Sequence, residues 1–192
     1  MEFQYLKNCK NIIIKDLILL KPKIFPDNRG YFIESWNKKK FANILNKDFD
    51  FLQDNFSYSI HGVLRGLHYQ TEPFAQDKLV SCEEGEIFDV AVDLRRNSET
   101  FGDWVGITLD DIEHKQFWIP KGFAHGFLVI SKSAKVKYKT TNYYSSDSER
   151  SIIWDDQDLN INWPLEKIKN RMPILSGKDA DSKTFQKIEI DF

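Results

Sequence analysis

Cysteine and histidine are scarce in this chain of 192 residues, which contains only Cys9, Cys82 and four histidines. Two cysteines are too few for a scaffold held by disulfides, which favours a reducing compartment, and we expect the cytoplasm. No Cys-x-x-Cys or His-x-His pair occurs, although β-proteins that bind zinc or iron commonly place two histidines two residues apart on one strand. We therefore expect no cofactor and no metal. A site in which the fold brings His68, His125 and a carboxylate together is the alternative.

Long apolar runs and a strong excess of one charge are also missing. The run NIIIKDLILL contains Lys15 and Asp16 and is too short to cross a bilayer, and the first residues, MEFQYLKNCKN, lack the apolar centre of a signal peptide. The net charge of -2 provides no general basic field for a nucleic acid backbone. We expect neither a membrane nor a nucleic acid as a partner, so a bound anion would need a local cluster of cations.

Aromatic residues are abundant, with 15 Phe, 7 Tyr and 5 Trp, and many short segments alternate between apolar and polar residues. These segments predict β-strands within residues 23–35, 78–82, 86–94, 104–109, 116–119, 126–130 and 135–141, with one or two more in NIIIKDLILL. Turn sequences such as PDNRG and EEGE separate them. This spacing is typical of an all-β sandwich, jelly roll or barrel. Residues 37–47 alone, before the C-terminal third, show helical periodicity.

Two of the histidines stand beside glycines, where the backbone can run close to a ligand: His68 in LRGLHYQ and His125 in IPKGFAHGF. A single histidine is most often a hydrogen-bonded core residue, but Arg65, Gln70, Gln76 and Lys78 place charge and polarity around His68. Two arginines, Arg29 in DNRGYF and Arg65 in VLRGLH, directly precede a glycine. Their guanidinium groups could bind phosphate in bidentate geometry, although each alone is typical of a surface turn.

Three further polar residues lie on predicted strands. Asp89 and Asp93 share one face of FDVAVDLR, so an inward-facing acid there must be paired or functional, while Asp93 is also explained as a turn residue. Tyr138 shares its face with Val136 and Thr140. An inward tyrosine is usually a core residue, and it becomes a catalytic acid only if it faces His68 across a cavity.

Nine ordered blocks resemble one family, the dTDP-4-dehydrorhamnose 3,5-epimerases of deoxysugar biosynthesis. In sequence order the blocks are FPDNRGYFIESW, FLQDNFSYS, VLRGLHYQ, QDKLV, GEIFDVAVDLRRNSETFG, WIPKGFAHGFLV, YKTTNYYS, WDDQDLNINWP and LSGKD. The resemblance implies a double-stranded β-helix, the cupin-like jelly roll, with short peripheral helices. It also implies a homodimer, a dTDP-sugar substrate and a single domain over residues 1–192, with a jelly-roll core at about 17–145 and a C-terminal extension at 146–192.

The resemblance also assigns roles. His68 is expected to be the base, oriented by Asp179, and Tyr138 the acid; Lys78 lies near the developing enolate, and His125 with Asp89 forms a second pair beside the sugar. The residues expected to bind the diphosphate and the nucleoside are Arg29, Arg65, Gln53, Asn55, Phe32, Glu34 and Tyr143, some of them supplied by a partner subunit. The implied product serves dTDP-rhamnose and surface polysaccharide synthesis, such as lipopolysaccharide.

Two residues depart from the family pattern. Phe56 replaces the usual His, and Asp77 replaces the usual Gly beside Lys78, where it would change the electrostatics at the sugar. Alternatives are therefore the same chemistry on another nucleotide sugar or at one carbon only, a relative that moves the keto group between C-3 and C-4, and a jelly-roll module that binds carbohydrate without catalysis.

Overall fold

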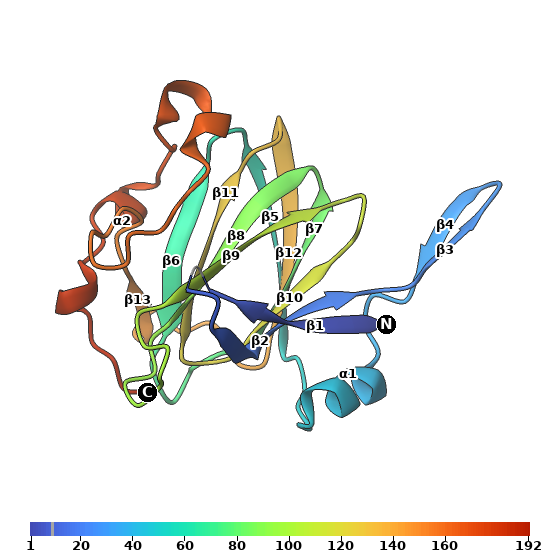
Figure 1. Ribbon diagram of the computed structural model, residues 1–192, viewed down its shortest axis with the longest axis horizontal. Helices are drawn as coiled ribbons and strands as arrows, with labels where there is room; N and C mark the ends of the chain where they lie inside the picture. The colour runs from blue at the N-terminus through green and yellow to red at the C-terminus, as the bar shows by residue number, and fades with distance from the viewer. Residues whose placement is uncertain (9) are drawn as a thin grey trace.

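Two antiparallel β-sheets packed face to face form most of the computed structural model, which describes residues 1–8 and 10–192 (Figure 1). One sheet has the order β1 (Glu2–Lys7), β2 (Ile13–Lys21), β10 (Gln116–Ile119), β7 (Lys78–Glu84), β12 (Ser133–Thr140), β5 (Gln53–Ile60). The other has the order β13 (Glu149–Ser151), β6 (Leu64–Gln70), β11 (Phe123–Val129), β8 (Glu86–Asp93), β9 (Trp104–Asp110). Strands far apart in sequence are neighbours, and the all-β jelly roll predicted from the sequence is confirmed.

The strands β5 and β6 were not predicted from hydrophobic alternation, and their surroundings explain why. On β5 the polar residues Gln53, Asn55 and Ser57 point inward, whereas Phe56 and Tyr58 point outward and are exposed. This is the reverse of the usual arrangement, in which the apolar face covers the core. The strand forms nonetheless because it pairs along its whole length with β12.

Three apolar clusters hold the layers together. The main cluster lies between the sheets and includes Val80, Phe117, Phe127 and Val136. A second cluster covers the outer face of the five-stranded sheet, and a third covers the outer face of the six-stranded sheet around Phe41. Burial of apolar side chains of this size, at about 1.5–3 kcal/mol each, is the main stabilising contribution.

The predicted helix is present as α1 (Lys38–Leu45). The side chain of Asn37 accepts a hydrogen bond from the backbone N–H of Lys40, and Asn46 ends the helix in the left-handed conformation. Phe41 is fully buried against Trp118 and neighbouring residues of the six-stranded sheet. This single contact face fixes the helix at the edge of the molecule.

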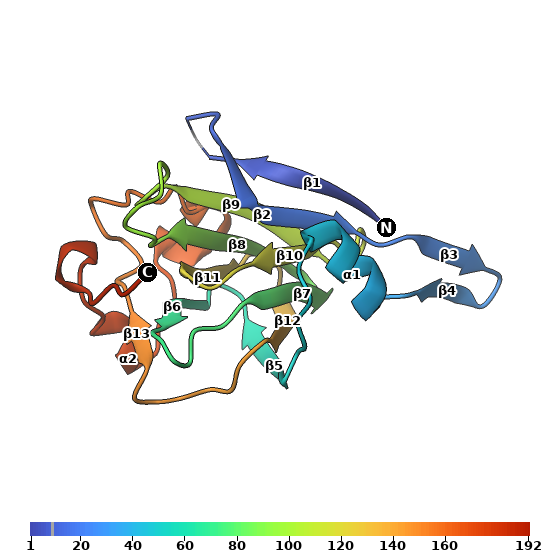
Figure 2. The ribbon, with the colours of Figure 1, turned by 90° about the horizontal axis from the view of Figure 1, so that it is seen from below.

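The C-terminal segment lies along the outer face of the five-stranded sheet, beside β6 and β13 (Figures 1 and 2). It contains short helices only: η1 (Leu165–Lys167), η2 (Lys169–Arg171), α2 (Gly177–Ala180), η3 (Phe185–Lys187). Trp163, Ile168 and Ile188 of this segment are buried against that sheet. Within the described residues, no helix is long and apolar enough to span a membrane.

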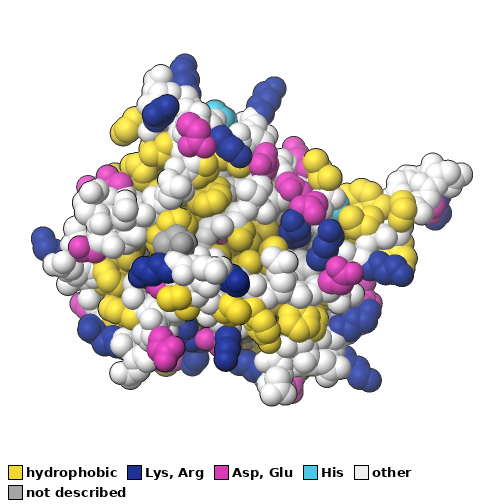
Figure 3. Space-filling model, viewed as in Figure 1, with side chains coloured by type: hydrophobic (Ala, Val, Ile, Leu, Met, Phe, Trp, Pro, Cys, Tyr) yellow, Lys and Arg dark blue, Asp and Glu magenta, His cyan; other side chains and the backbone are white. Residues whose placement is uncertain are grey.

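A two-stranded hairpin projects away from the sandwich (Figures 1 and 3). It consists of β3 (Ile24–Asp27) and β4 (Gly30–Ile33), so the segment predicted as one strand region is two paired strands. Tyr31 and Phe32 on this hairpin are 60% and 68% exposed. Large aromatic side chains on a projecting arm are unusual for a surface that remains in water.

Two glycines allow β6 and β11 to approach closely. A Cβ atom on Gly66 would lie 2.6 Å from the Cα of Gly126 and 2.7 Å from the carbonyl oxygen of His125. The φ angle of Gly66, +118°, is also one that L-residues rarely adopt. Because these strands place His68 directly opposite His125 in the register, the close approach positions both histidines.

We predict that Gly66→Ala lowers the free energy of unfolding by about 2–4 kcal/mol, because the added methyl group clashes with β11 and the backbone is strained. Urea denaturation measures this change. Gly177→Ala is the matched control: a Cβ there meets nothing within 4 Å, and the change should stay within about 0.5 kcal/mol. Equal stability of Gly66→Ala and the wild type would contradict the prediction.

Candidate active site

A cavity of about 260 Å³ is lined by side chains from both sheets. The lining residues are Ser57, Arg65, His68, Tyr69, Gln70, Gln76, Lys78, His125, Phe127, Tyr138, Tyr144 and Glu149. Five of the residues predicted to act on or bind a substrate, Arg65, His68, Lys78, His125 and Tyr138, therefore line one cavity. It contains cationic, acidic and aromatic side chains in a space suited to one sugar-sized ligand.

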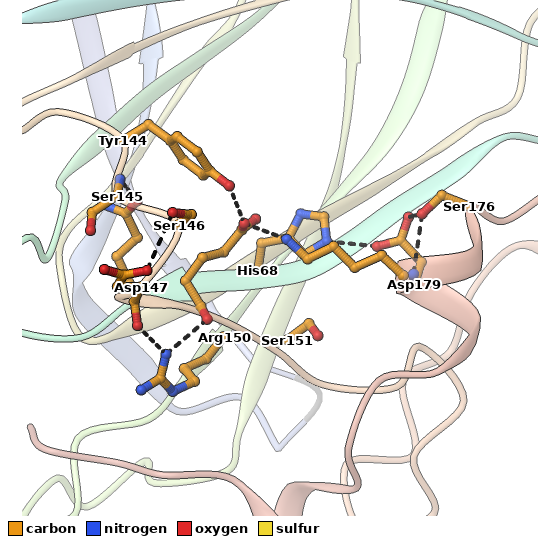
Figure 4. Close-up of polar contacts among 12 residues, drawn as sticks. His68, Tyr144, Ser145, Ser146, Asp147, Arg150, Ser151, Ser176 and Asp179 are labelled. Atoms are coloured by element: carbon orange, nitrogen blue, oxygen red, sulfur yellow. Dashed lines mark hydrogen bonds and ion pairs between the residues drawn. The ribbon is translucent and has the colours of Figure 1, made fainter.

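Asp179 holds the imidazole ring of His68 through a short contact. Its Nε2 lies 2.6 Å from Oδ1 of Asp179, a residue 111 positions away in the sequence (Figure 4). Burial acts to raise the pKa of Asp179, but hydrogen bonds from His68 and Ser176 outweigh it and the pKa lies below its usual value. The carboxylate is therefore ionised and accepts the Nε2–H, which leaves Nδ1 of His68 as the nitrogen able to take up a proton.

The sequence LSGKD shapes the helix that carries this aspartate. Ser176 caps α2: its Oγ accepts the backbone N–H of Asp179 and donates to Oδ2 of the same residue at 2.7 Å. The N–H of Gly66 also points to Oδ1, at 3.4 Å. Both carboxylate oxygens are thus fixed, and the imidazole of His68 is fixed with them.

A second histidine and aspartate pair lies beside the first. Nε2 of His125 is 3.0 Å from both carboxylate oxygens of Asp89, which is completely buried on β8. Burial raises the pKa of Asp89, while the charge and hydrogen bond of His125 act against that rise. The inward acid predicted on this strand is therefore paired. Asp93 instead binds Arg95, Ser98 and Thr100 in the following turn, in agreement with its interpretation as a turn residue.

Lys78 reaches from β7 toward the opposite sheet, and its Nζ lies 3.4 Å from the carbonyl oxygen of His68. Burial lowers the pKa of Lys78 to about 8, and the negative charges of Asp89 and Glu149 act in the opposite direction. At neutral pH this lysine remains mostly protonated. It places a desolvated positive charge in the cavity, where a developing anion would be stabilised most strongly.

Tyr138 lines the cavity from β12, in the sheet opposite to that of His68. Burial raises the pKa of its hydroxyl group. The hydroxyl therefore keeps its proton at neutral pH and is available as a donor. The sequence left open whether Tyr138 and His68 share a cavity, and the structure brings them to the same one.

The residues predicted to bind the nucleotide fall into two groups. Arg65, at the cavity, donates from Nε to Ser59 Oγ at 3.0 Å. Gln53, Asn55 and Tyr143 lie on β5 and the loop after β12, where Gln53 donates to Asn55 and accepts the N–H of Tyr144. These side chains border the cavity region but do not line it.

The second group, Arg29, Phe32 and Glu34, lies on or beside the projecting hairpin and not at the cavity of its own chain. The guanidinium of Arg29 binds Asp27 at 2.6 Å within the hairpin turn. Glu34 accepts a hydrogen bond from Lys40 at 2.5 Å. The sequence could not show this separation, because it follows from the direction of the hairpin.

The two departures from the family pattern do not face the cavity. Asp77 is buried, and its carboxylate accepts hydrogen bonds from Lys47 at 2.8 Å, the N–H of Lys121 at 3.0 Å and Thr141 at 3.2 Å. Asp77 is not among the residues that line the cavity, and its carboxylate instead joins three segments of the chain. Phe56 points outward from β5 and is 61% exposed.

Ser57, Tyr144 and Glu149 are among the polar residues of the cavity that sequence reasoning missed. Tyr144 donates its hydroxyl hydrogen to Glu149 at 2.7 Å, and both side chains line the same cavity as His68. Glu149 also pairs with Lys178. No sequence pattern distinguishes Glu149 in the polar stretch SSDSERS, because only its pairing with β6 brings it to the cavity.

The arrangement provides the parts for proton transfer at carbon. A histidine with an ionised partner can accept a proton, a protonated tyrosine on the opposite wall can donate one, and a buried cation can stabilise the charge that forms between the two events. Two such groups on opposite sides of a ring are what inversion of a carbon requires.

The comparisons with known proteins agree on one family. The family model described as dTDP-4-dehydrorhamnose 3,5-epimerase matches residues 11–187. A protein of that name from Shigella flexneri is 51% identical over 90% of this chain and 92% of its own length. The crystal structure of a dTDP-6-deoxy-D-glucose-3,5-epimerase from Legionella pneumophila, in complex with dTDP-4-keto-L-rhamnose, is 46% identical, with a TM-score of 0.89 over 98% of this chain and 95% of that one. A 3'-monoepimerase from Streptomyces bikiniensis is 32% identical, with a TM-score of 0.83 over 89% and 84% of the two chains.

We predict that Lys78→Met is more stable than the wild type at pH 7, by about 2–3 kcal/mol, and that the difference shrinks as the pH rises from 8 to 10. The pKa of Lys78 is about 8 in the folded protein, below that of an unfolded lysine. Between these values the unfolded chain binds more protons, so wild-type stability rises with pH, and the methionine variant lacks this gain.

Urea denaturation at several pH values measures the free energy of unfolding of Lys78→Met and of the wild type. Lys121→Met is the control, because Lys121 is exposed and its pKa is raised by Glu72. Its stability relative to the wild type should stay nearly constant from pH 7 to 10. Parallel pH dependences of Lys78→Met and the wild type would contradict the prediction.

Proposed function

This chain belongs to the dTDP-4-dehydrorhamnose 3,5-epimerase family, and we propose that the cavity around His68 carries out the family's reaction with the groups described above. The reaction converts dTDP-4-dehydro-6-deoxy-D-glucose to dTDP-4-dehydro-L-rhamnose. The observation that carries the assignment of roles is the position of His68 with Asp179 on one wall and Tyr138 on the other wall of one cavity.

The 4-keto group makes the chemistry possible at both carbons. The hydrogens on C-3 and C-5 are both α to the carbonyl, so either can leave as a proton when the resulting enolate is stabilised. Nδ1 of His68 takes the proton from one face and Tyr138 returns one from the other, which inverts the carbon. Asp179 stabilises the imidazolium and keeps its orientation, as the buried carboxylate of a catalytic triad does.

Lys78 stabilises the enolate in this scheme. Its charge is desolvated and fixed, and removal of one such donor typically costs on the order of 100-fold in rate. His125, held by Asp89, lies opposite His68 on the neighbouring strand and contacts the sugar from the same wall. Arg65 at the cavity binds the diphosphate, so that binding energy remote from the ring orients the reacting carbons.

Inversion at both carbons is favoured over inversion at one. Identity to the relative named a 3,5-epimerase is 51%, compared with 32% to the solved 3'-monoepimerase. The single 4-keto group activates both C-3 and C-5, so the same catalytic groups of the cavity can act on either carbon. A module that only binds carbohydrate would have no use for two histidines, each paired with a buried aspartate, beside a buried lysine.

We propose that the protein works as a homodimer in which the hairpin of one copy reaches the cavity of the other. Arg29 and Phe32 lie away from their own cavity, and the aromatic residues of the hairpin are exposed in a single chain. A partner surface would cover Phe32 and bring Arg29 to the diphosphate. With only two cysteines in the chain, we place the enzyme in the cytoplasm, supplying dTDP-rhamnose for lipopolysaccharide or another surface polysaccharide.

The reaction is tested by incubating dTDP-4-dehydro-6-deoxy-D-glucose with the enzyme in deuterium oxide. We predict deuterium at C-3 and at C-5, detected by proton NMR and mass spectrometry. His68→Ala should abolish incorporation at both carbons, whereas Tyr138→Phe should slow product formation by about 100-fold or more. Labelling at one carbon would establish a monoepimerase, and labelling at neither would refute the proposed function.

The subunit arrangement is tested by mixing two inactive variants, His68→Ala and Arg29→Ala, and allowing subunits to exchange. If the hairpin serves the partner's cavity, half of the dimers are mixed and each contains one native site, so about one quarter of wild-type activity returns. If the hairpin served its own cavity, every site would lack one residue and activity would stay at the level of the parent variants. Size-exclusion chromatography with light scattering verifies the dimer.

A further inference from the structure

Glu149 is a third carboxylate at the catalytic cavity, beyond Asp179 and Asp89. It lies at the start of β13, opposite Gln70 of β6 in the register, and its side chain lines the cavity with only 14% of its surface exposed. Two groups hold its carboxylate: the ammonium of Lys178 and the hydroxyl of Tyr144 at 2.7 Å. None of the roles assigned above uses it.

The charge of Glu149 acts on the principal reacting groups. Burial acts to raise the pKa of Glu149, but hydrogen bonds from Lys178 and Tyr144 and the charge of His68 outweigh it, so the carboxylate is ionised. Its negative charge also acts to raise the pKa values of Lys78 and Tyr138. This effect opposes that of burial at Lys78 and adds to that of burial at Tyr138. Because electrostatic coupling between two groups is reciprocal, a protonated His68 and an ionised Glu149 stabilise one another.

The neighbouring residues Lys178 and Asp179 link this carboxylate to the base. Asp179 binds Nε2 of His68, and Lys178 binds Glu149, so the short helix α2 fixes both charged partners at once. The charged and titratable groups around His68 are Asp179 and Lys178 on α2, Glu149 on β13, Lys78 on β7, Arg65 on β6, His125 with Asp89 on β11 and β8, and Tyr138 and Tyr144. Glu149 and Lys178 form the pair whose charges can be removed without touching the dyad.

We propose that Glu149 is a positioning residue for the epimerisation, which stabilises the protonated form of His68, and that Lys178 sets the strength of this effect. The inference rests on the proposed function. When the C–H bond at C-3 or C-5 breaks, the proton goes to Nδ1 of His68 and the electron pair to the enolate. The imidazolium then has one carboxylate, Asp179, in hydrogen-bond contact and a second, Glu149, in the same cavity, which favours the charged intermediate over its precursor.

The test uses the acid limb of the pH profile of kcat/KM, which reports protonation of the base in the free enzyme. In Glu149→Gln the lost negative charge and the unpaired Lys178 both disfavour imidazolium, so the limb should move about 0.5–1 pH unit to lower pH. In Lys178→Met the negative charge is unopposed and the limb should move by a similar amount to higher pH. The double variant removes both charges, and its limb should return close to that of the wild type.

Glu189→Gln is the matched control, because Glu189 pairs with Arg150 on the surface and does not line the cavity. Its acid limb should coincide with that of the wild type. A titration of the His68 imidazole by NMR in the substrate-free protein should show midpoints that shift in the same directions. This readout needs no turnover, so it tests the inference even if the isotope experiment refutes the proposed function.

Opposite shifts in the two single variants support the proposal, because loss of packing or of fold would lower activity without moving the limb in a direction set by charge. Limbs and NMR midpoints that stay within about 0.2 pH unit of the wild type in both variants overturn it. Shifts in the same direction for both variants overturn it as well.

Discussion

The cost of burying charge controls the arrangement of this cavity. An ionised carboxylate removed from water is strongly destabilising unless hydrogen bonds and an opposite charge compensate it. Asp179 has His68, Ser176 and the N–H of Gly66, and Asp89 has His125. Each of the two carboxylates in turn fixes a histidine in one orientation. The contacts that compensate the buried acids are thus the same ones that orient the two histidines.

This requirement constrains the fold around the cavity. His68 and His125 are opposite one another on β6 and β11, and the facing glycines Gly66 and Gly126 let these strands come close. Asp89 must lie on β8, the strand on the other side of β11, to reach His125. The inner face of β5 borders the cavity and not the apolar core. Its polar residues therefore point inward, and Phe56 points outward.

Local patterns in the sequence were enough for the strands that alternate normally and for helix α1, and the family resemblance was enough for the dyad. Hydrophobic alternation failed at β5 and β6 because these strands present polar residues to the cavity. Glu149 escaped notice since its importance depends on the pairing of β13 with β6, 79 residues away along the chain from Gln70 to Glu149. The placement of the Asp77 side chain could not be predicted for a related reason: sequence adjacency to Lys78 says nothing about side-chain direction, and successive residues of an extended chain point to opposite sides.

The C-terminal segment is more than a cover for the sheet, because its helix α2 carries the partners of two cavity residues, His68 and Glu149. It packs on the outer face of the five-stranded sheet through Trp163 and Ile168, and this packing brings α2 against the middle of β6. Asp179 and Lys178 are consecutive, so any shift of α2 would change the partner of His68 and the partner of Glu149 together. Lys178 is positive and Asp179 negative, so in the proposed scheme the balance of these two charges acts on the imidazole of His68, and not either charge alone. Burial of apolar residues on the outer face of the sheet thus fixes the charged groups around His68.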